Sequence, residues 1–317
     1  MSICRVIVFQ FLITFGHSTE ECHFYETERP LVNSLLSTLL RSVEDDHSTN
    51  PDPAAFLALR LANQHNFKGE RRFRQRLAEA AVREVKKGED FSTGRIALYT
   101  LAFRSACLDP AYISDGHSQI NLVELLSFKL RQEIQSLVLN RQPLTDYYQL
   151  TLAILAHCTE KQRVPANVVK ELIGRIMNYE APFGKVFSVD TASMSVLALS
   201  CLHRSPHNEI SRHEIEKPIM QLLLEILARK QEDGNIGTIY STGLAIQALI
   251  VNQQLKFQQF QCSNYLEKLI SEIPKGTFDS VQRISQVIPA LEGHTYLDVQ
   301  SLDCTSDQDN LLQENES

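Results

Sequence analysis

The chain has 317 residues, of which 43% are hydrophobic, and its formal net charge is −7. The composition is that of a globular protein with a substantial core. The negative charge argues against a nucleic-acid partner or an anionic membrane surface, because both require a basic face. The densest basic run, residues 71–76, alternates with apolar residues and is better explained as a solvated helix face than as an anion site.

Residues 1–18 have the features of a signal peptide. Arg5 supplies a positive charge, residues 6–15 are apolar, and Gly16 and Ser18 are the small residues expected before a cleavage site. The apolar run is too short to cross a bilayer, and no other segment of the sequence is long enough. We therefore expect a secreted, extracellular protein that starts near Thr19 and has no membrane span.

Two kinds of helix alternate along the rest of the chain. The first kind is amphipathic, and is predicted over residues 31–43, 71–87, 120–137, 165–178, 211–230 and 263–273. The second kind is short, rich in Ala, Ser or Gly and apolar nearly all round, so it should be buried. It is predicted over residues 53–63, 94–106, 146–158, 190–203, 241–252 and 282–291. Long runs of alternating β-branched residues are absent, so the predicted fold class is all-α.

Six buried helices alternating with six amphipathic ones predict a closed double ring, an α6/α6 toroid. Polar residues open the buried helices at Thr93, Thr145, Asp190 and Ser241, and recur roughly 45 to 52 residues apart, as in a helical-hairpin repeat. The hairpins alternate in direction, so the N-termini of the buried helices should share one rim. Free N–H groups and positive dipole ends gather there and can hold a polar ligand.

The polar residues of this rim have a simpler explanation as well. Thr145, Asp190 and Ser241 would each serve as a plain helix cap, contributing about 1 kcal/mol. The adjacent Tyr147 and Tyr148 should point to different faces, one into the core and one to the rim.

After the last helix the character of the sequence changes. Residues 301–317 are acidic and polar without apolar periodicity, and predict a disordered tail or linker stub. The expected organisation is therefore a signal peptide over 1–18, a toroid domain over 19–300 and an acidic tail over 301–317.

Six cysteines remain once Cys4 is removed with the signal peptide. An even number in an oxidising compartment predicts three disulfides, although spacing alone does not choose among the possible pairings. No two cysteines have the spacing of a zinc site, so no metal site is expected. The six are Cys22, Cys107, Cys158, Cys201, Cys262 and Cys304.

Several short motifs point to a known family. They are Thr-Asp-Tyr-Tyr-Gln at 145–149, Ser-Val-Asp-Thr-Ala-Ser-Met at 188–194, Gly-Thr-Ile-Tyr-Ser-Thr at 237–242, Ile-Ser-Gln-Val-Ile-Pro-Ala-Leu at 284–291 and Thr-Tyr-Leu-Asp at 295–298. With the six cysteines, they make residues 19–304 resemble the secreted cobalamin-binding proteins, the family of transcobalamin, intrinsic factor and haptocorrin. The resemblance implies an α6/α6 toroid and the disulfides Cys22–Cys262, Cys107–Cys304 and Cys158–Cys201.

The resemblance also implies a ligand. Cobalamin, or a related corrinoid, would be bound as cargo and not as a catalytic cofactor, edge-on between the toroid and a smaller C-terminal β domain. That β domain is not expected within this chain. The positions that match ligand-contacting residues of the family are Thr145, Tyr148, Gln149, Asp190, Ser241, Gln286 and, where the family commonly has asparagine, Thr238. The amide of Gln286 lies in an apolar helix, so the ligand or a neighbouring cap must satisfy it.

Besides Thr238, two further positions depart from the family. Phe187 stands where transcobalamin has a histidine that can coordinate cobalt, so we expect no protein ligand to the metal and a packing role for the ring. Arg95 stands where transcobalamin has glutamine.

The implied function is cobalamin binding and transport by a secreted monomer that is not an enzyme, with a cell-surface uptake receptor as a further partner. Two other classes remain open. One is a secreted structural or interaction protein that has lost tight ligand binding. The other is a glycosidase on the same toroid with Asp146 and Asp190 as acid and base, although the chain has no tryptophan for sugar subsites.

Overall fold

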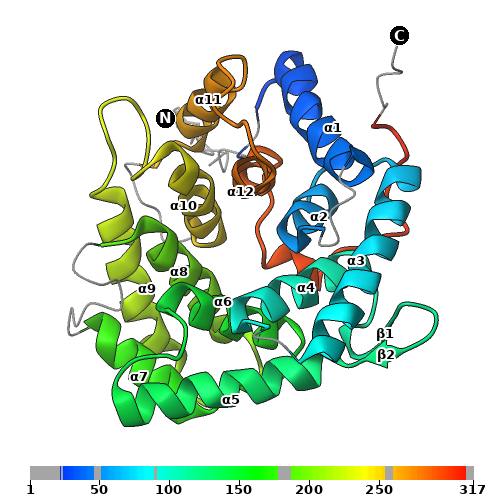
Figure 1. The fold of residues 1–317 in the computed structure, drawn as a ribbon. Coiled ribbons are helices and arrows are strands. Elements are labelled where there is room, and N and C mark those ends of the chain that lie inside the picture. Colours follow the sequence, from blue (N-terminus) through cyan, green and yellow to red (C-terminus); the bar gives the residue numbers. More distant parts are fainter. Residues whose placement is uncertain are drawn as a thin grey trace, which may run out of the picture.

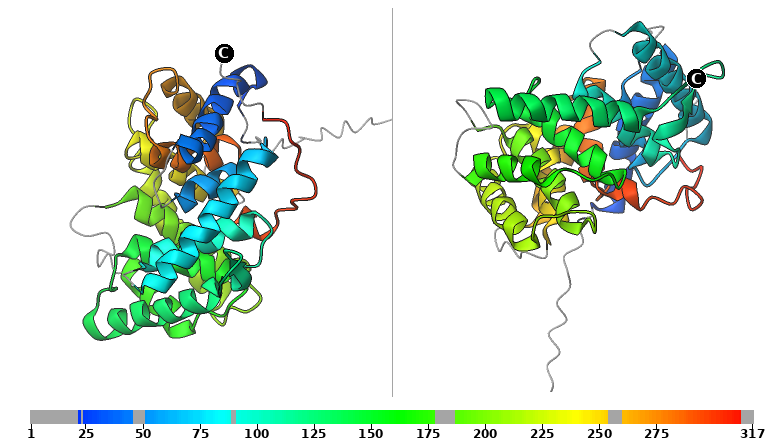
Figure 2. Two further views of the ribbon diagram at one scale, coloured as in Figure 1. Left: turned by 45° about the vertical axis from the view of Figure 1, so that its right-hand side comes forward. Right: turned by 90° about the horizontal axis from the view of Figure 1, so that it is seen from below.

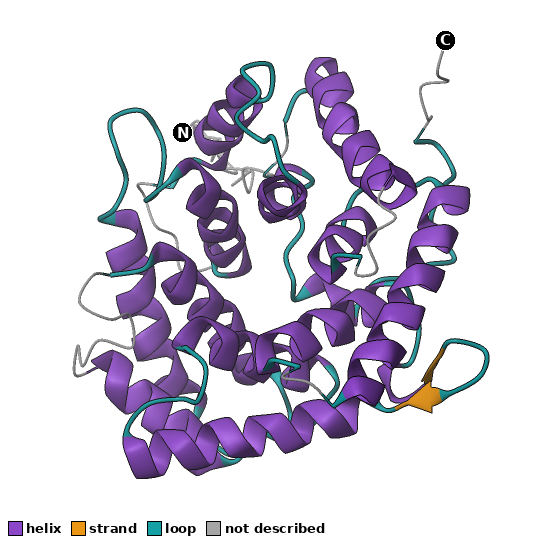
Figure 3. Cartoon of the chain, in the orientation of Figure 1, coloured by secondary structure: helices purple, strands orange, loops and turns teal. Residues whose placement is uncertain are grey.

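The computed structural model describes residue 22 and residues 24–45, 51–88, 91–177, 187–253 and 260–311. The expected signal peptide lies outside the described residues. Within them α-helices joined by loops make up most of the chain (Figure 3). The α-helices are α1 (Arg29–Asp45), α2 (Pro53–Arg60), α3 (Phe67–Lys87), α4 (Thr93–Ser105), α5 (Leu122–Asn140), α6 (Tyr147–Thr159), α7 (Ala166–Met177), α8 (Val189–Arg204), α9 (Arg212–Leu227), α10 (Ile239–Val251), α11 (Cys262–Glu272) and α12 (Val281–Leu291). One short antiparallel hairpin pairs β1 (Ile113–Ser114) with β2 (Gln119–Ile120).

The even-numbered helices form an inner ring. Each packs against the next in the order α2, α4, α6, α8, α10 and α12, and α12 packs against α2, so the ring closes. Figure 1 shows the odd-numbered helices arranged around the outside of this ring. The twelve helices of the described residues thus match the predicted alternation of buried and amphipathic segments, and the all-α fold class is confirmed.

The inner helices are buried because they are apolar on every side. In α8, every residue from Val189 to Leu202 is buried except Asp190. The outer helices bury only one stripe, as in α7, where Val168, Leu172 and Ile176 face inward. The single partly exposed carboxylate in an otherwise buried helix marks the first turn of α8 as a place where the protein presents a polar group.

The inner helices run in the same direction, because hydrogen bonds join the start of one helix to the start of the next and the end of one to the end of the next. At one end of the ring, the Gly94 N–H at the start of α4 donates to Gln149 Oε1 in the first turn of α6 at 3.4 Å. At the other end, Arg60 of α2 donates to the carbonyl of Ser105, the last residue of α4. The N-termini of the inner helices therefore share one edge of the ring, called the N-terminal rim below.

The C-terminal strap, residues 301–311, differs from the expectation of a disordered tail. It runs along the outside of the toroid beside α2 and α3 (Figure 2). The side chain of Leu311 is buried, and its N–H donates to the carbonyl of His65 at 2.9 Å. A parallel bridge joins Asp309 to His65. The sequence prediction failed here because the strap is held by partners some 240 residues away, which local composition does not reveal.

Three disulfides tie distant parts of the chain together. They join Cys22 to Cys262, Cys107 to Cys304 and Cys158 to Cys201, with Cα–Cα distances of 5.4, 6.2 and 6.2 Å. This is the pairing that the family resemblance implies. The Cys107–Cys304 bridge fastens the strap to the C-terminal end of α4, and Cys158–Cys201 joins the C-terminal ends of α6 and α8. No helix among the described residues has the length and hydropathy needed to cross a bilayer.

Candidate functional site

The seam between α8 and α10 brings together three of the predicted site residues. The Ser241 hydroxyl donates to Asp190 Oδ2 at 3.1 Å and lies 2.9 Å from the hydroxyl of Thr238. Ser241 is buried, Asp190 is partly buried and Thr238 is exposed. These residues form a polar chain that leads from solvent into the rim.

Burial sets the electrostatics of this seam. It raises the pKa of Asp190, and the hydrogen bond from Ser241 lowers it only in part. A carboxylate that has lost part of its hydration is a strong acceptor for a ligand N–H. The new hydrogen bond stabilises the buried negative charge that water no longer solvates.

The predicted caps have different roles from those expected. Thr145, Asp190 and Ser241 are not the N-cap residues of their helices. The side chains that accept from the first-turn N–H groups are Asp146, Ser188 and Thr238. Asp190 and Ser241 lie in the first turn of their helices, two and three residues after the N-cap. Neither side chain is the N-cap, and the Asp190 carboxylate keeps acceptor capacity beyond the bond from Ser241.

Thr145 and Gln149 belong to the seam between α4 and α6. The Thr145 hydroxyl donates to Glu133 Oε1 at 2.8 Å, and Thr93 donates to the same oxygen at 2.8 Å. Glu133 is buried on the outer helix α5, so it ties the starts of two inner helices together. Thr145 is therefore already anchored, and a structural role accounts for its hydroxyl.

Gln149 packs closely against the next helix. Its Nε2 donates to Asp146 Oδ2 at 3.1 Å, and its Oε1 accepts from the Gly94 N–H. A Cβ atom at position 94 would come within 2.7 Å of Gln149 Cγ, so only glycine allows this contact. The amide of Gln149 is held in place at the rim by neighbours on both sides.

Tyr148 lies near Tyr296, which follows the last helix, α12. Burial raises the pKa of Tyr148, and the nearby Tyr296, Asp190 and Asp146 raise it further. Burial and then Asp52, the N-cap residue of α2, raise the pKa of Tyr296. Both phenols therefore stay protonated and can donate hydrogen bonds.

The backbone around Tyr296 is also anchored in the ring. Its N–H donates to Oε1 of Gln247, a fully buried side chain of α10, at 3.1 Å. Tyr147, by contrast, bonds to Arg175 on the outer helix α7. The two adjacent tyrosines thus point to different faces, as predicted.

Gln286 corrects one expectation from the sequence. Although it lies in the apolar helix α12, its side chain is exposed, so its amide has no need of a buried partner. The backbone of Gln286 lies against Gly243 of α10, so these two helices approach closely at this point. Gln286 and Thr238 are the exposed members of the predicted site.

Phe187 and Arg95 have partners within the protein. The Phe187 ring packs against the core, and the Arg229 guanidinium lies 4.6 Å from its centroid. Arg95 forms a two-pronged ion pair with Glu84, with both N–O distances 2.9 Å. Phe187 has the packing role expected of it, and Arg95 is turned toward α3.

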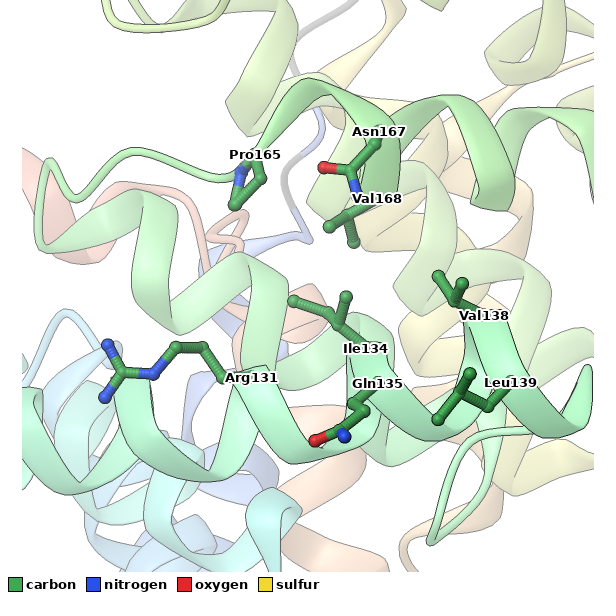
Figure 4. A pocket seen from close by; sticks show the side chains of 8 residues that line it. All are labelled: Arg131, Ile134, Gln135, Val138, Leu139, Pro165, Asn167 and Val168. Atoms are coloured by element: carbon green, nitrogen blue, oxygen red, sulfur yellow. The ribbon is translucent and has the colours of Figure 1, made fainter.

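Two hollows in the surface lie elsewhere. Figure 4 shows the larger, about 360 Å³, between the outer helices α5 and α7, where Ile134, Val138 and Leu139 face Pro165 and Val168. A second, of about 220 Å³, lies where the strap meets α3. Neither is lined by a rim residue named above. Among the described residues, no group of three or more His, Cys, Asp or Glu side chains could hold a metal ion.

Sequence reasoning missed Glu133 and the position of Tyr296. Glu133 falls on the same stripe of α5 as Leu126, Leu130 and Leu137, and an acid on an apolar stripe is the signal that could have found it. Tyr296 was noted only as part of the motif at 295–298. No pattern in the neighbouring sequence indicates that the chain returns to the inner ring after α12.

The chain resembles several proteins of known class. A sequence model described as "Eukaryotic cobalamin-binding protein" matches residues 4–317. Cobalamin binding intrinsic factor of Homo sapiens is 28% identical over 302 residues, which are 93% of this chain and 67% of that protein. Transcobalamin-2 of Homo sapiens is 31% identical over 312 residues, covering 93% and 71%. Transcobalamin-1 of Homo sapiens is 36% identical over 242 residues, covering 71% and 54%.

A solved structure agrees with these relatives. The crystal structure of haptocorrin in complex with Cbi matches with a TM-score of 0.72 at 29% identity, covering 91% of this chain and 73% of that one. The chain thus spans between 54% and 71% of the length of the three curated relatives named above. The match of the family model over nearly the whole chain shows that the protein belongs to the eukaryotic cobalamin-binding protein family.

Proposed function

We propose that this protein binds cobalamin or a related corrinoid at the N-terminal rim, as a secreted carrier. The observation that carries the proposal is the polar chain of Asp190, Ser241 and Thr238, which runs from solvent into the first turns of two inner helices. Membership of the family supplies the ligand class, since the relatives are named for binding cobalamin.

The residues of the rim fit such a ligand chemically. A corrinoid carries amide groups around its edge, and each amide both donates and accepts hydrogen bonds. The rim offers a carboxylate acceptor in Asp190, phenol donors in Tyr148 and Tyr296, and an exposed amide in Gln286. Bound there, the corrinoid would bring its cobalt as cargo, and the protein residues would hold and orient the amide edge.

The carrier role rests on further features. Three disulfides suit an oxidising, extracellular compartment. We infer binding without chemistry on the ligand, by a monomer that a cell-surface receptor takes up. Asp146, which a glycosidase would need as acid or base, accepts from Gln149 through both carboxylate oxygens, as a helix cap does.

Equilibrium dialysis with cyanocobalamin tests the proposal. An open rim leaves one side of the ligand in water, so residues 19–317 by themselves should bind at about micromolar Kd, near −8 kcal/mol. A β domain from a related carrier, added in trans, should tighten binding by about tenfold or more by covering that side.

A matched pair of variants locates the site. Asp190→Ala should weaken binding by about 1–3 kcal/mol. Glu209→Ala should leave it unchanged, because Glu209 lies on the surface beyond the opposite end of α8. Absence of binding with and without the β domain would instead favour an interaction protein that holds no corrinoid.

A further inference from the structure

The pocket between α3 and the C-terminal strap has an unusual charge. Two arginines of α3, Arg71 and Arg74, line it, and the strap residues Cys304 and Asp307 form another part of its wall. Among the described residues, neither Arg71 nor Arg74 has an ion-pair partner. The basic run at 71–76 is a helix face, as predicted, but two of its arginines face this hollow.

The helix that carries these arginines is basic in an acidic protein. α3 has eight Lys or Arg residues and three Glu, whereas the whole chain has a net charge of −7. Each of the three glutamates has a partner other than Arg71 and Arg74. Glu70 pairs with the buried Arg60 at 2.6 Å, Glu79 accepts from Gln75, and Glu84 pairs with Arg95. Glu70 and Asp307 line the pocket too, but both pair with Arg60, another lining residue, and neither is paired with Arg71 or Arg74.

The strap is an example of an acidic segment that binds to this surface. It carries three aspartates and no basic residue, and after a turn at residues 304–306 it continues as an extended segment. Asp307 pairs with Arg60 and lies 3.4 Å from His65 Nε2. Two residues later, Asp309 Oδ1 accepts from the Phe67 N–H at the start of α3 at 2.9 Å. The carboxylates of Asp307 and Asp309 thus bind Arg60, His65 and the start of α3, and Asp303 accepts from Thr305. None of the three is paired with Arg71 or Arg74.

We propose that the pocket lined by Arg71 and Arg74 is a docking site for an acidic, extended segment of a partner protein, which would lie alongside the strap. Guanidinium groups recognise carboxylates by paired hydrogen bonds, and they do so most strongly where water is partly excluded. The disulfide Cys107–Cys304 holds the strap wall in place, so the pocket exists before the partner arrives. This site is separate from the rim and does not depend on corrinoid binding.

Fluorescence anisotropy of a labelled hexaglutamate peptide on the full chain provides the test. The peptide should bind at about 50 mM salt and weaken at about 300 mM, because salt screens a partly exposed charge pair. The double variant Arg71→Gln/Arg74→Gln should lower the affinity about fivefold or more. Arg212→Gln/Lys217→Gln, which removes the same charge from exposed positions on α9, should lower it less than about twofold.

Four results would overturn the proposal. The first is equal loss in the two double variants, which would show a general charge effect. The second is equal binding of hexaglutamine, or no binding of hexaglutamate. The third is displacement of the peptide by an equal concentration of inorganic sulfate, which would identify a simple oxyanion site. The fourth is a marked gain in affinity in Glu314→Gln/Glu316→Gln, which would identify the chain's own C-terminus as the occupant.

Discussion

The Ser241 hydroxyl donates to the Asp190 carboxylate at 3.1 Å across 51 residues of sequence, and this bond joins the first turns of α8 and α10. Asp190 interrupts a helix that is otherwise buried from Val189 to Leu202. Ser241 uses only part of the carboxylate's acceptor capacity. The remaining capacity lies at the N-terminal rim, where the proposed corrinoid would sit.

A first prediction concerns the pH dependence of binding. Burial raises the pKa of Asp190, so the acid takes up a proton at a higher pH than an exposed aspartate does. A ligand N–H needs the ionised carboxylate, and cyanocobalamin affinity should therefore fall as pH is lowered from 7 through the pKa of Asp190. Because the pKa of Asp190 is raised in the folded protein, its protonation does not lower the free energy of unfolding. At this residue, acid should therefore weaken ligand binding without destabilising the fold.

Asp190→Asn provides the control for this prediction. Asparagine keeps the size of the side chain and cannot ionise, so its binding should be weaker at pH 7 and nearly independent of pH. Dialysis at a series of pH values measures both proteins. The same acid dependence in Asp190→Asn as in the unmodified chain would place the titrating group elsewhere.

A second prediction concerns Glu133, the buried acid that joins Thr93 to Thr145. Glu133→Ala removes the acceptor of both hydroxyls and should lower the free energy of unfolding by about 2–4 kcal/mol. Glu124→Ala, at an exposed position on the same helix, should cost less than about 1 kcal/mol. Urea denaturation compares the two, and similar costs would mean that Glu133 does not tie the rim together.

A third prediction concerns stability in acid. Burial lowers the pKa of His157 from 6.5 to about 4, and its Nε2 lies 3.0 Å from the Ser127 hydroxyl. The folded protein thus keeps this histidine neutral, whereas the unfolded chain protonates it below about pH 6.5. Its contribution to stability is complete above that pH and is lost as pH falls toward 4.

Denaturation at pH 7 and pH 4.5 measures this contribution. The unmodified chain should lose about 2–3 kcal/mol more than His157→Gln between these pH values. Because other titrating groups are common to both proteins, their effects cancel in the comparison. An identical loss in the two would show that His157 does not titrate as its burial requires.

The fold was predictable because its signals are local. Each inner helix is apolar all round and each outer helix has one apolar stripe, as α8 and α7 illustrate, and a closed ring follows from their alternation. The motif at 145–149 and the Asp190 and Ser241 positions were also found from sequence. The parts that were missed depend on contacts between distant segments, as with the strap against His65 and Tyr296 against Gln247.

The roles of individual residues were harder to predict than their positions. Sequence does not say which polar residue at a helix start is the cap. A shift of two or three residues turned Asp190 and Ser241 from caps into residues inside the first turn. Gln286 was expected to need a partner for its amide because its helix is apolar, but its side chain lies on the exposed side of α12, which is decided by how the helices pack in the ring.

A fourth prediction concerns cobalt. Phe187 cannot coordinate a metal, and it stands where transcobalamin has a histidine that can. Bound aquocobalamin should therefore keep its water, and Phe187→His should change its visible spectrum as imidazole replaces that water. Phe187→Leu serves as the control and should leave the spectrum as in the unmodified chain. Imidazole-type ligation by the unmodified chain would refute this interpretation of the position.

The central claim is that the N-terminal rim of the inner ring holds the corrinoid, and hydrogen exchange with and without cyanocobalamin tests it most directly. Corrinoid binding at the rim should slow exchange over residues 145–152, 188–195 and 238–245, which are the starts of α6, α8 and α10. The pocket between α5 and α7 and the strap pocket beside α3 should exchange as before. Protection confined to either of those pockets, with the helix starts unchanged, would contradict the account.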